Sequence, residues 1–106
     1  MQTKLTKAQK AELKTMREMA DQSQIEIHHR SEMGVCVVLK RNPGFGAHVA
    51  WSVKSEGENR YRRKVAEYVA LNRFFDGVYL PLANVDNGYN EVADTIESLA
   101  ITIVNA

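Results

Sequence analysis

The chain has 106 residues, 44% of them hydrophobic and 25% charged, with a formal charge of +1. This length suits one domain, which we expect to span residues 1–106, and the hydrophobic share excludes a disordered tail. The net charge hides a segregation. Residues 1–73 carry fourteen basic and eight acidic side chains, a formal +6, whereas residues 74–106 carry five acids and no base. Charge gathered in one part of a chain can form a recognition surface.

The sequence also disfavours secreted and membrane-spanning proteins. Cys36 is the single cysteine, so no internal disulfide can form, and its place in the apolar run 35–39 is typical of a small buried hydrophobe. No apolar stretch is long enough for a membrane span, and the charges that recur from Lys4 to Lys10 do not suit a signal peptide. We therefore expect a cytoplasmic location without membrane contact.

A first helix is predicted over about residues 7–21. Thr6 and Gln9 have the spacing of a capping box, which opens a helix by satisfying two backbone N–H groups. Leu13, Met16 and Ala20 recur at helical spacing and form an apolar face suited to packing on a sheet. A basic stripe occupies a sector roughly 80° wide on the opposite face. It consists of Lys7, Lys10, Lys14 and Arg17, and Lys4 would extend it if the helix began earlier.

Three strands are predicted next, because apolar residues alternate or dominate in the runs Gln24–Arg30, Val35–Arg41 and Ala47–Lys54. Two short connections, rich in turn-forming residues, join these strands and predict an antiparallel meander. We expect Val35, Val37 and Leu39 of the second strand to share one core face with Ile25 and Ile27 of the first.

A second helix is predicted over Asn59–Phe75, opened by a capping box at residues 55–58 or by Asn59 itself. Its expected packing face comprises Tyr61, Val65, Tyr68, Val69, Asn72 and Phe75, with Leu71 beside them. Gly77 stands where a helix C-terminal glycine belongs. The run Val78–Leu82 then predicts a short fourth strand or a buried loop, and Pro81 confines such a strand to an edge of the sheet.

A third helix over residues 90–103 is predicted from the spacing of Val92, Ile96, Leu99 and Ile103. Residues 98–104 could instead form a strand, because isoleucine, threonine and valine dominate there. The element order is therefore α-β-β-β-α-(β)-α. Helices packed on one face of a three- to four-stranded antiparallel sheet make an α+β fold.

The first two predicted helices both begin with basic residues, and the second opens with Arg60, Arg62, Arg63 and Lys64. The helix dipole favours anions at this end, so positive charge there is unfavourable by roughly 0.3–1 kcal/mol per charge. A local rule broken twice points to function. Basic side chains beside free backbone N–H groups suit a phosphate. The alternative is that these side chains only solvate outward-facing helix surfaces.

The run Arg63-Lys64-Val65-Ala66-Glu67-Tyr68-Val69-Ala70 resembles the Lys-Lys-x-Ala-Glu-x-x-Ala stretch of double-stranded-RNA-binding domains. The predicted α-β-β-β-α order of residues 7–75 is also that family's order. The resemblance implies that Arg63 and Lys64 contact phosphates across the major groove of a duplex, with the first helix as a neighbouring contact face. In place of the family's Gly-Pro-x-His turn the chain has Ser31-Glu32-Met33-Gly34.

Histidine and cysteine suggest no catalytic or metal-binding set. His28 and His48 could share a sheet face with Cys36 if the strand register permits, yet their spacing matches no compact zinc signature. No activating base for Cys36 can be named. We therefore expect no cofactor, no metal and no enzymatic activity. Phe45, at the tip of the turn at residues 44–46, could stack on a base or enter a partner's pocket.

Two functions remain. The first is a nucleic-acid-binding protein that contacts the phosphates of a duplex through basic helix faces, with little sequence readout. The second is a protein-binding regulator or inhibitor that docks on an acidic protein surface or a nucleoprotein complex, in the general style of bacteriophage accessory proteins. Opposed basic and acidic segments could also support a homodimer. The candidate contact residues are Lys7, Lys10, Lys14, Arg17, Phe45, Arg60, Arg62, Arg63 and Lys64.

Overall fold

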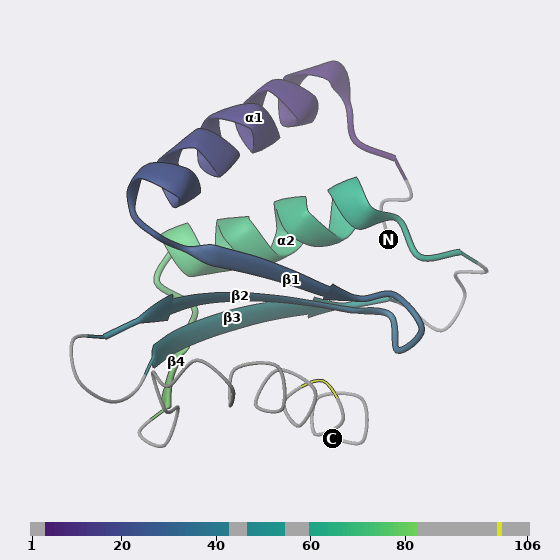
Figure 1. Cartoon of the computed structure of the whole chain (residues 1–106). Coiled ribbons are helices and arrows are strands. Elements are labelled where there is room, and N and C mark those ends of the chain that lie inside the picture. Colours follow the sequence, from purple (N-terminus) through teal and green to yellow (C-terminus); the bar gives the residue numbers. More distant parts are fainter. Residues whose placement is uncertain (1–3, 43–46, 55–59, 83–99, 101–106) are drawn as a thin grey trace.

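The computed structural model describes residues 4–42, 47–54, 60–82 and 100 (Figure 1). Its elements are, in order, α1 (Lys7–Gln22), β1 (Glu26–Arg30), β2 (Val35–Arg41), β3 (Ala47–Val53), α2 (Arg63–Phe75) and β4 (Leu80–Leu82). The four strands form one antiparallel sheet in the order β1-β2-β3-β4. Figure 1 shows α1 and α2 on the same side of this sheet. The predicted α+β fold is confirmed, as is the predicted element order up to residue 82, and β4 occupies an edge of the sheet as Pro81 requires.

Tight connections set the order of the meander. After the C-cap Ser23 of α1, Gln24 adopts the left-handed backbone region at φ 59°, and β1 begins at Glu26. Gly34 closes the turn between β1 and β2 at φ 71°, and a Cβ placed on it would lie 2.8 Å from the Cβ of Lys54. Only glycine fits this position, because a side chain there would be strained and would collide with the neighbouring strand.

The strand register assigns the two faces of the sheet. Ile27 lies opposite Val38, and Val38 lies opposite Ala50, so these three residues share the face that the helices cover. The expectation that the odd-numbered residues of β2 join the isoleucines is wrong. They pack on the opposite face in a second buried cluster, which comprises Val35, Val37, Leu39, Ala47, Val49 and Ala100. Every residue in the apolar run of β2 is buried, so alternation alone could not choose the face.

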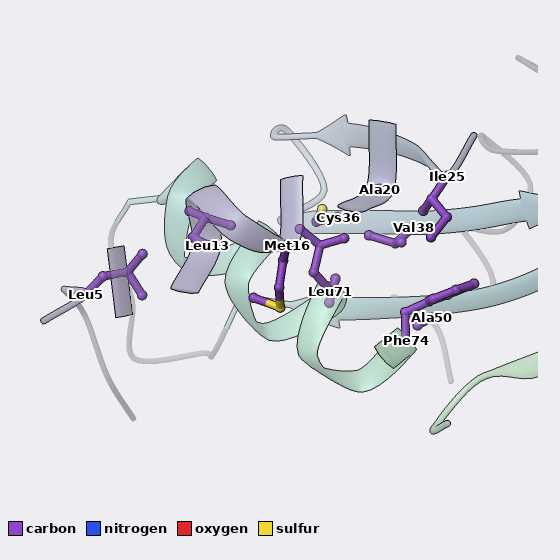
Figure 2. Packing of buried hydrophobic residues seen from close by; sticks show 11 residues of the cluster. Leu5, Leu13, Met16, Ala20, Ile25, Cys36, Val38, Ala50, Leu71 and Phe74 are labelled. Atoms are coloured by element: carbon purple, nitrogen blue, oxygen red, sulfur yellow. The ribbon is translucent and has the colours of Figure 1, made fainter. Parts of the chain in front are cut away.

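The main core lies between the helices and the sheet (Figure 2). From α1 it takes Leu13, Met16 and Ala20, as the apolar spacing predicted. Leu71 on α2 is fully buried, and truncating such a leucine to alanine typically costs about 2–5 kcal/mol. The side chains of this cluster on α1, α2 and the strands meet in Figure 2, which also places Leu5 at one end of the row.

The buried face of α2 differs from the predicted one. The buried residues of α2 are Glu67, Ala70, Leu71 and Phe74, so of the predicted set only Leu71, placed beside the face, is fully buried. Val65, Tyr68 and Phe75 of the predicted face are partly buried and pack against the edge of the main core. The hydroxyl of Tyr68 reaches the surface and donates a hydrogen bond of 2.6 Å to Glu12 on α1. Tyrosine suits such a boundary, because its ring packs while its hydroxyl stays accessible to polar partners.

The two helices run in the same direction and begin at the same end of the molecule (Figure 1). Contacts of α2 with the sheet fall on β2 and β3, and α1 packs against α2. The start of α2 also differs from expectation, since the helix begins at Arg63 with Arg62 as its N-cap. Arg60 and Arg62 therefore precede the helix. Gly77, with φ 81°, follows its C-cap as predicted.

Some predicted features lie outside the described residues. These are the capping signals at residues 55–59, the loop tip at Phe45, and the third helix at 90–103 with its helix-or-strand alternative at 98–104. Of that last segment the structure describes only Ala100, which is helical and buried.

Candidate functional site

A basic cavity lies where the segment leading into α1 meets the start of α2. It is open to the surface and has a volume of about 330 Å³, which is the lower end of the range typical of ligand pockets. Six of its nine described lining residues are lysine or arginine, and none of the nine is acidic. The cavity is lined by Lys4, Leu5, Lys10, Arg60, Tyr61, Arg62, Arg63, Lys64 and Val65.

The first wall of the basic cavity is held by the start of α1. The Thr6 hydroxyl accepts a hydrogen bond of 3.1 Å from the Gln9 backbone, and the Gln9 side chain accepts one of 2.9 Å from the Thr6 backbone. This capping box, predicted from the sequence, fixes the path of the chain into the helix. Leu5 is anchored in the main core with 9% of its surface exposed, which leaves Lys4 and Lys10 at the cavity on either side of the cap.

The second wall is the segment leading into α2, and Tyr61 anchors it to the sheet. The Tyr61 hydroxyl donates a hydrogen bond of 3.1 Å to the Val35 carbonyl and lies 2.6 Å from Nδ1 of His29. Burial, followed by the proximity of Cys36, raises the pKa of the Tyr61 hydroxyl above its ordinary value, so the hydroxyl keeps its proton. The anchor fixes the backbone that carries Arg60 and Arg62.

Electrostatics at the start of α2 favour an anion. Arg62 is the N-cap, but its side chain makes no capping hydrogen bond, and the first turn carries no acid. The positive ends of the α1 and α2 dipoles lie at the same side of the molecule (Figure 1). Among the residues that the structure describes, Nε of Arg62 is buried without a hydrogen-bond partner. A bound anion would offset the accumulated positive charge.

A buried polar network beneath the helices engages one predicted contact residue. Arg17 forms an ion pair with Glu67, and its Nε donates a hydrogen bond of 2.7 Å to that carboxylate. Nε2 of His29 donates a second hydrogen bond of 2.6 Å to Glu67, whose side chain is only 10% exposed. Burial by itself raises the pKa of Glu67, but the hydrogen bonds from His29 and Arg17 outweigh it and hold the pKa below its ordinary value. Arg17 thus links α1 to α2 and does not line the cavity.

The structure brings together only part of the predicted contact set. Lys10 and the four basic residues at 60 and 62–64 meet at the cavity, whereas Lys7 and Lys14 are exposed on α1 outside it. Tyr61 and Val65, expected on the packing face of α2, and Leu5, which is absent from the predicted contact set, also line the cavity. The alternation of basic and aromatic residues at 60–62 was the available signal for Tyr61.

The strand register bears out the histidine and cysteine hypothesis for His48, which shares the sheet face of Cys36, but not for His28. His29, and not His28, lies directly opposite Cys36, while His28 lies opposite Val37 on the other face. Within the described ranges, no group of three or more histidine, cysteine or acidic residues is placed to hold a metal ion. Burial, with a smaller contribution from the charge of Glu67, raises the pKa of the Cys36 thiol to about 12, so the thiol is not an activated nucleophile.

Comparison with known proteins does not assign the chain to a family. No protein-family model, no curated protein and no solved structure matches it. In the part of the chain that the structure describes, neither helix has the length and apolar character needed to cross a bilayer. The site is therefore interpreted from its own chemistry.

Proposed function

We propose that this protein binds nucleic acid by placing backbone phosphates in the basic cavity, with little readout of base sequence. The observation that carries this proposal is the convergence of six cationic side chains from two separate segments on one concave site, at a helix start without a side-chain cap. Arginine and lysine beside a helix N-terminus match the charge and hydrogen-bonding needs of phosphate oxygens. Cations that only solvate a helix would not need to line a common concavity.

Double-helical RNA is the first ligand to test, because the resemblance to double-stranded-RNA-binding domains implies it. Arg63 and Lys64 carry that resemblance, and both are exposed in the first turn of α2 at the cavity. In such domains the corresponding pair contacts phosphates across the major groove, a mode that depends on duplex shape. We also propose that the protein binds this nucleic acid in the cytoplasm.

The test is equilibrium binding of fluorescently labelled duplex RNA and duplex DNA at about 50 and 200 mM salt. Neutralising about five phosphates gives a log–log salt slope of about −4, so affinity should fall steeply between these conditions. A preference for RNA supports the family resemblance, whereas equal affinity for both duplexes indicates a generic phosphate site.

A pair of matched variants localises the binding. Reversal of two charges in the cavity, Arg63→Glu with Lys64→Glu, should abolish binding at the higher salt and flatten the salt slope. The same reversal outside the cavity, Lys7→Glu with Lys14→Glu, changes the net charge equally and should leave most of the affinity. Equal losses in the two double variants would contradict the cavity as the site.

Docking on an acidic protein surface is the competing outcome of the same experiment. It would be indicated if neither duplex binds at low salt while the chain forms a stoichiometric complex that survives nuclease treatment. Self-association into a homodimer would be seen as a concentration-dependent mass in sedimentation.

A further inference from the structure

The basic cavity combines cationic side chains with an apolar surface. A site for phosphate alone would not require the apolar surface. Three of its lining residues, Leu5, Tyr61 and Val65, are apolar or aromatic. Leu5 is held in the main core and Val65 packs against that core, so both are fixed in place. A phosphate-only site would gain nothing from this surface, because apolar atoms offer no hydrogen bonds to an anion.

The orientation of Tyr61 decides which of its groups is available to a ligand. Its hydroxyl is committed to the Val35 carbonyl at 3.1 Å and to His29 at 2.6 Å. The imidazole of His29 meets the Tyr61 ring edge to face, with ring centroids 5.6 Å apart. Tyr61 also lines the cavity, and because its hydroxyl is held by these partners, the ring is the part of the side chain left to meet a ligand. An aromatic ring among guanidinium groups is the combination on which nucleobases stack.

We infer that the basic cavity takes an unpaired nucleotide, with its phosphate at the start of α2 and its base against Tyr61. This inference rests on the proposed function and narrows its ligand. In a continuous duplex the bases are stacked and paired, so only phosphates can reach a concave site. A single-stranded overhang or an unpaired end supplies both a phosphate and a free base. The preferred nucleic acid is therefore a duplex with an unpaired overhang.

The experiment compares three duplexes with the same paired region: one blunt, one with a four-nucleotide overhang, and one with a four-nucleotide overhang that is abasic. The two overhangs carry equal phosphate charge, so any difference between them reports contact with bases. Stacking on an aromatic residue is worth enough to give the normal overhang an affinity at least about fivefold higher than the abasic one. Equal affinities for the two overhangs would overturn the inference and leave phosphate binding intact. Failure of all three duplexes to bind at low salt would reject the proposed function itself.

Two variants test the assignment of the base to Tyr61. Tyr61→Phe keeps the ring but removes the hydroxyl that anchors this segment to Val35 and His29, so its overall affinity should fall. The ratio of its affinities for the normal and the abasic overhang should stay as in the unaltered protein. Tyr61→Leu removes the ring and should bring the two affinities within about twofold, as expected once stacking is lost. Retention of the full preference in Tyr61→Leu would place the base elsewhere. The comparison of overhangs on the unaltered protein stands even if Tyr61→Leu does not fold.

Discussion

The starts of α1 and α2 lie at the same end of the molecule but are built in opposite ways (Figure 1). The start of α1 is closed by its own residues, because Thr6 and Gln9 exchange hydrogen bonds with each other's backbone. The start of α2 has Arg62 at the N-cap, no side-chain cap and no acid in its first turn. A helix start that is not closed locally can be held by tertiary contacts and completed by a ligand. This difference is the reason for proposing the start of α2, and not that of α1, as the phosphate site.

The tertiary support beneath the open start is the network around Glu67, and breaking it should have the largest effect on stability. Glu67→Ala leaves His29 and Arg17 without their acceptor, so we expect a loss of about 2–3 kcal/mol in the free energy of unfolding. Urea denaturation followed by circular dichroism measures it. Glu12, the exposed acceptor of the Tyr68 hydroxyl, is the matched control, and Glu12→Ala should cost under about 1 kcal/mol. Equal costs would mean that the network does not hold α2.

The same network predicts how stability depends on pH. The pKa of Glu67 is lower in the folded chain than its ordinary value, so its stabilisation is present above the ordinary carboxyl pKa. That stabilisation is lost as the pH falls through the lowered pKa, where the carboxylate becomes protonated. The free energy of unfolding should therefore fall less between pH 7 and pH 3 in Glu67→Gln than in the unaltered protein. An identical acid profile for the two proteins would contradict this assignment.

An acidic N-cap at the start of α2 should increase the stability of the fold and decrease the affinity for nucleic acid. Arg62→Asp supplies the missing cap, so we expect the free energy of unfolding to rise by about 0.5–1 kcal/mol. The same change should weaken nucleic-acid binding at least about tenfold, since a charge-assisted contact is replaced by repulsion. Arg62→Gln is the control, because it removes the cation but adds no negative charge at the N-cap. It should weaken binding and should stabilise the fold less than Arg62→Asp does. A stabilised variant with unchanged affinity would show that the open start is not used by the ligand.

Opening the start of α1 should have a smaller effect, confined to stability. Thr6→Ala removes the capping box and should cost about 1 kcal/mol in the free energy of unfolding. Affinity for nucleic acid should stay within about twofold, as no phosphate contact is removed. Thermal or urea denaturation and the duplex-binding assay measure the two quantities on the same preparation. A loss of binding as large as that of Arg62→Asp would make the two helix starts equivalent.

Local features of the fold could be predicted from the sequence. The capping box and apolar spacing of α1 act within a few residues, so Thr6, Gln9 and Leu13 were assigned correctly. The meander was also predictable, because short turns leave antiparallel pairing as the simple connection. Which residues of β2 face the helices could not be predicted. Both Cys36 and Val37 are fully buried, so the apolar run fits either assignment of odd- and even-numbered residues to the two faces of the sheet.

The cavity depends on contacts that a linear pattern does not contain. Arg60 and Arg62 were assigned to a helix that begins only at Arg63, because the anchoring of Tyr61 to Val35 on β2 is a long-range contact. The ion pair between Arg17 and Glu67 likewise depends on how α1 packs against α2. Charge patterning therefore indicated the basic residues, and tertiary packing selected which of them share a site.

The most direct test of the contrast between the two helix starts is an NMR titration of the isotopically labelled chain with duplex RNA at low salt. We expect the backbone amides of residues 62–65 to show the largest progressive shifts, whereas those of residues 6–9, held by the capping box of α1, should shift less even though Lys4 and Lys10 line the same cavity. Shifts of equal size at both helix starts, or shifts confined to residues remote from the cavity, would contradict the assignment of the phosphate site to the start of α2.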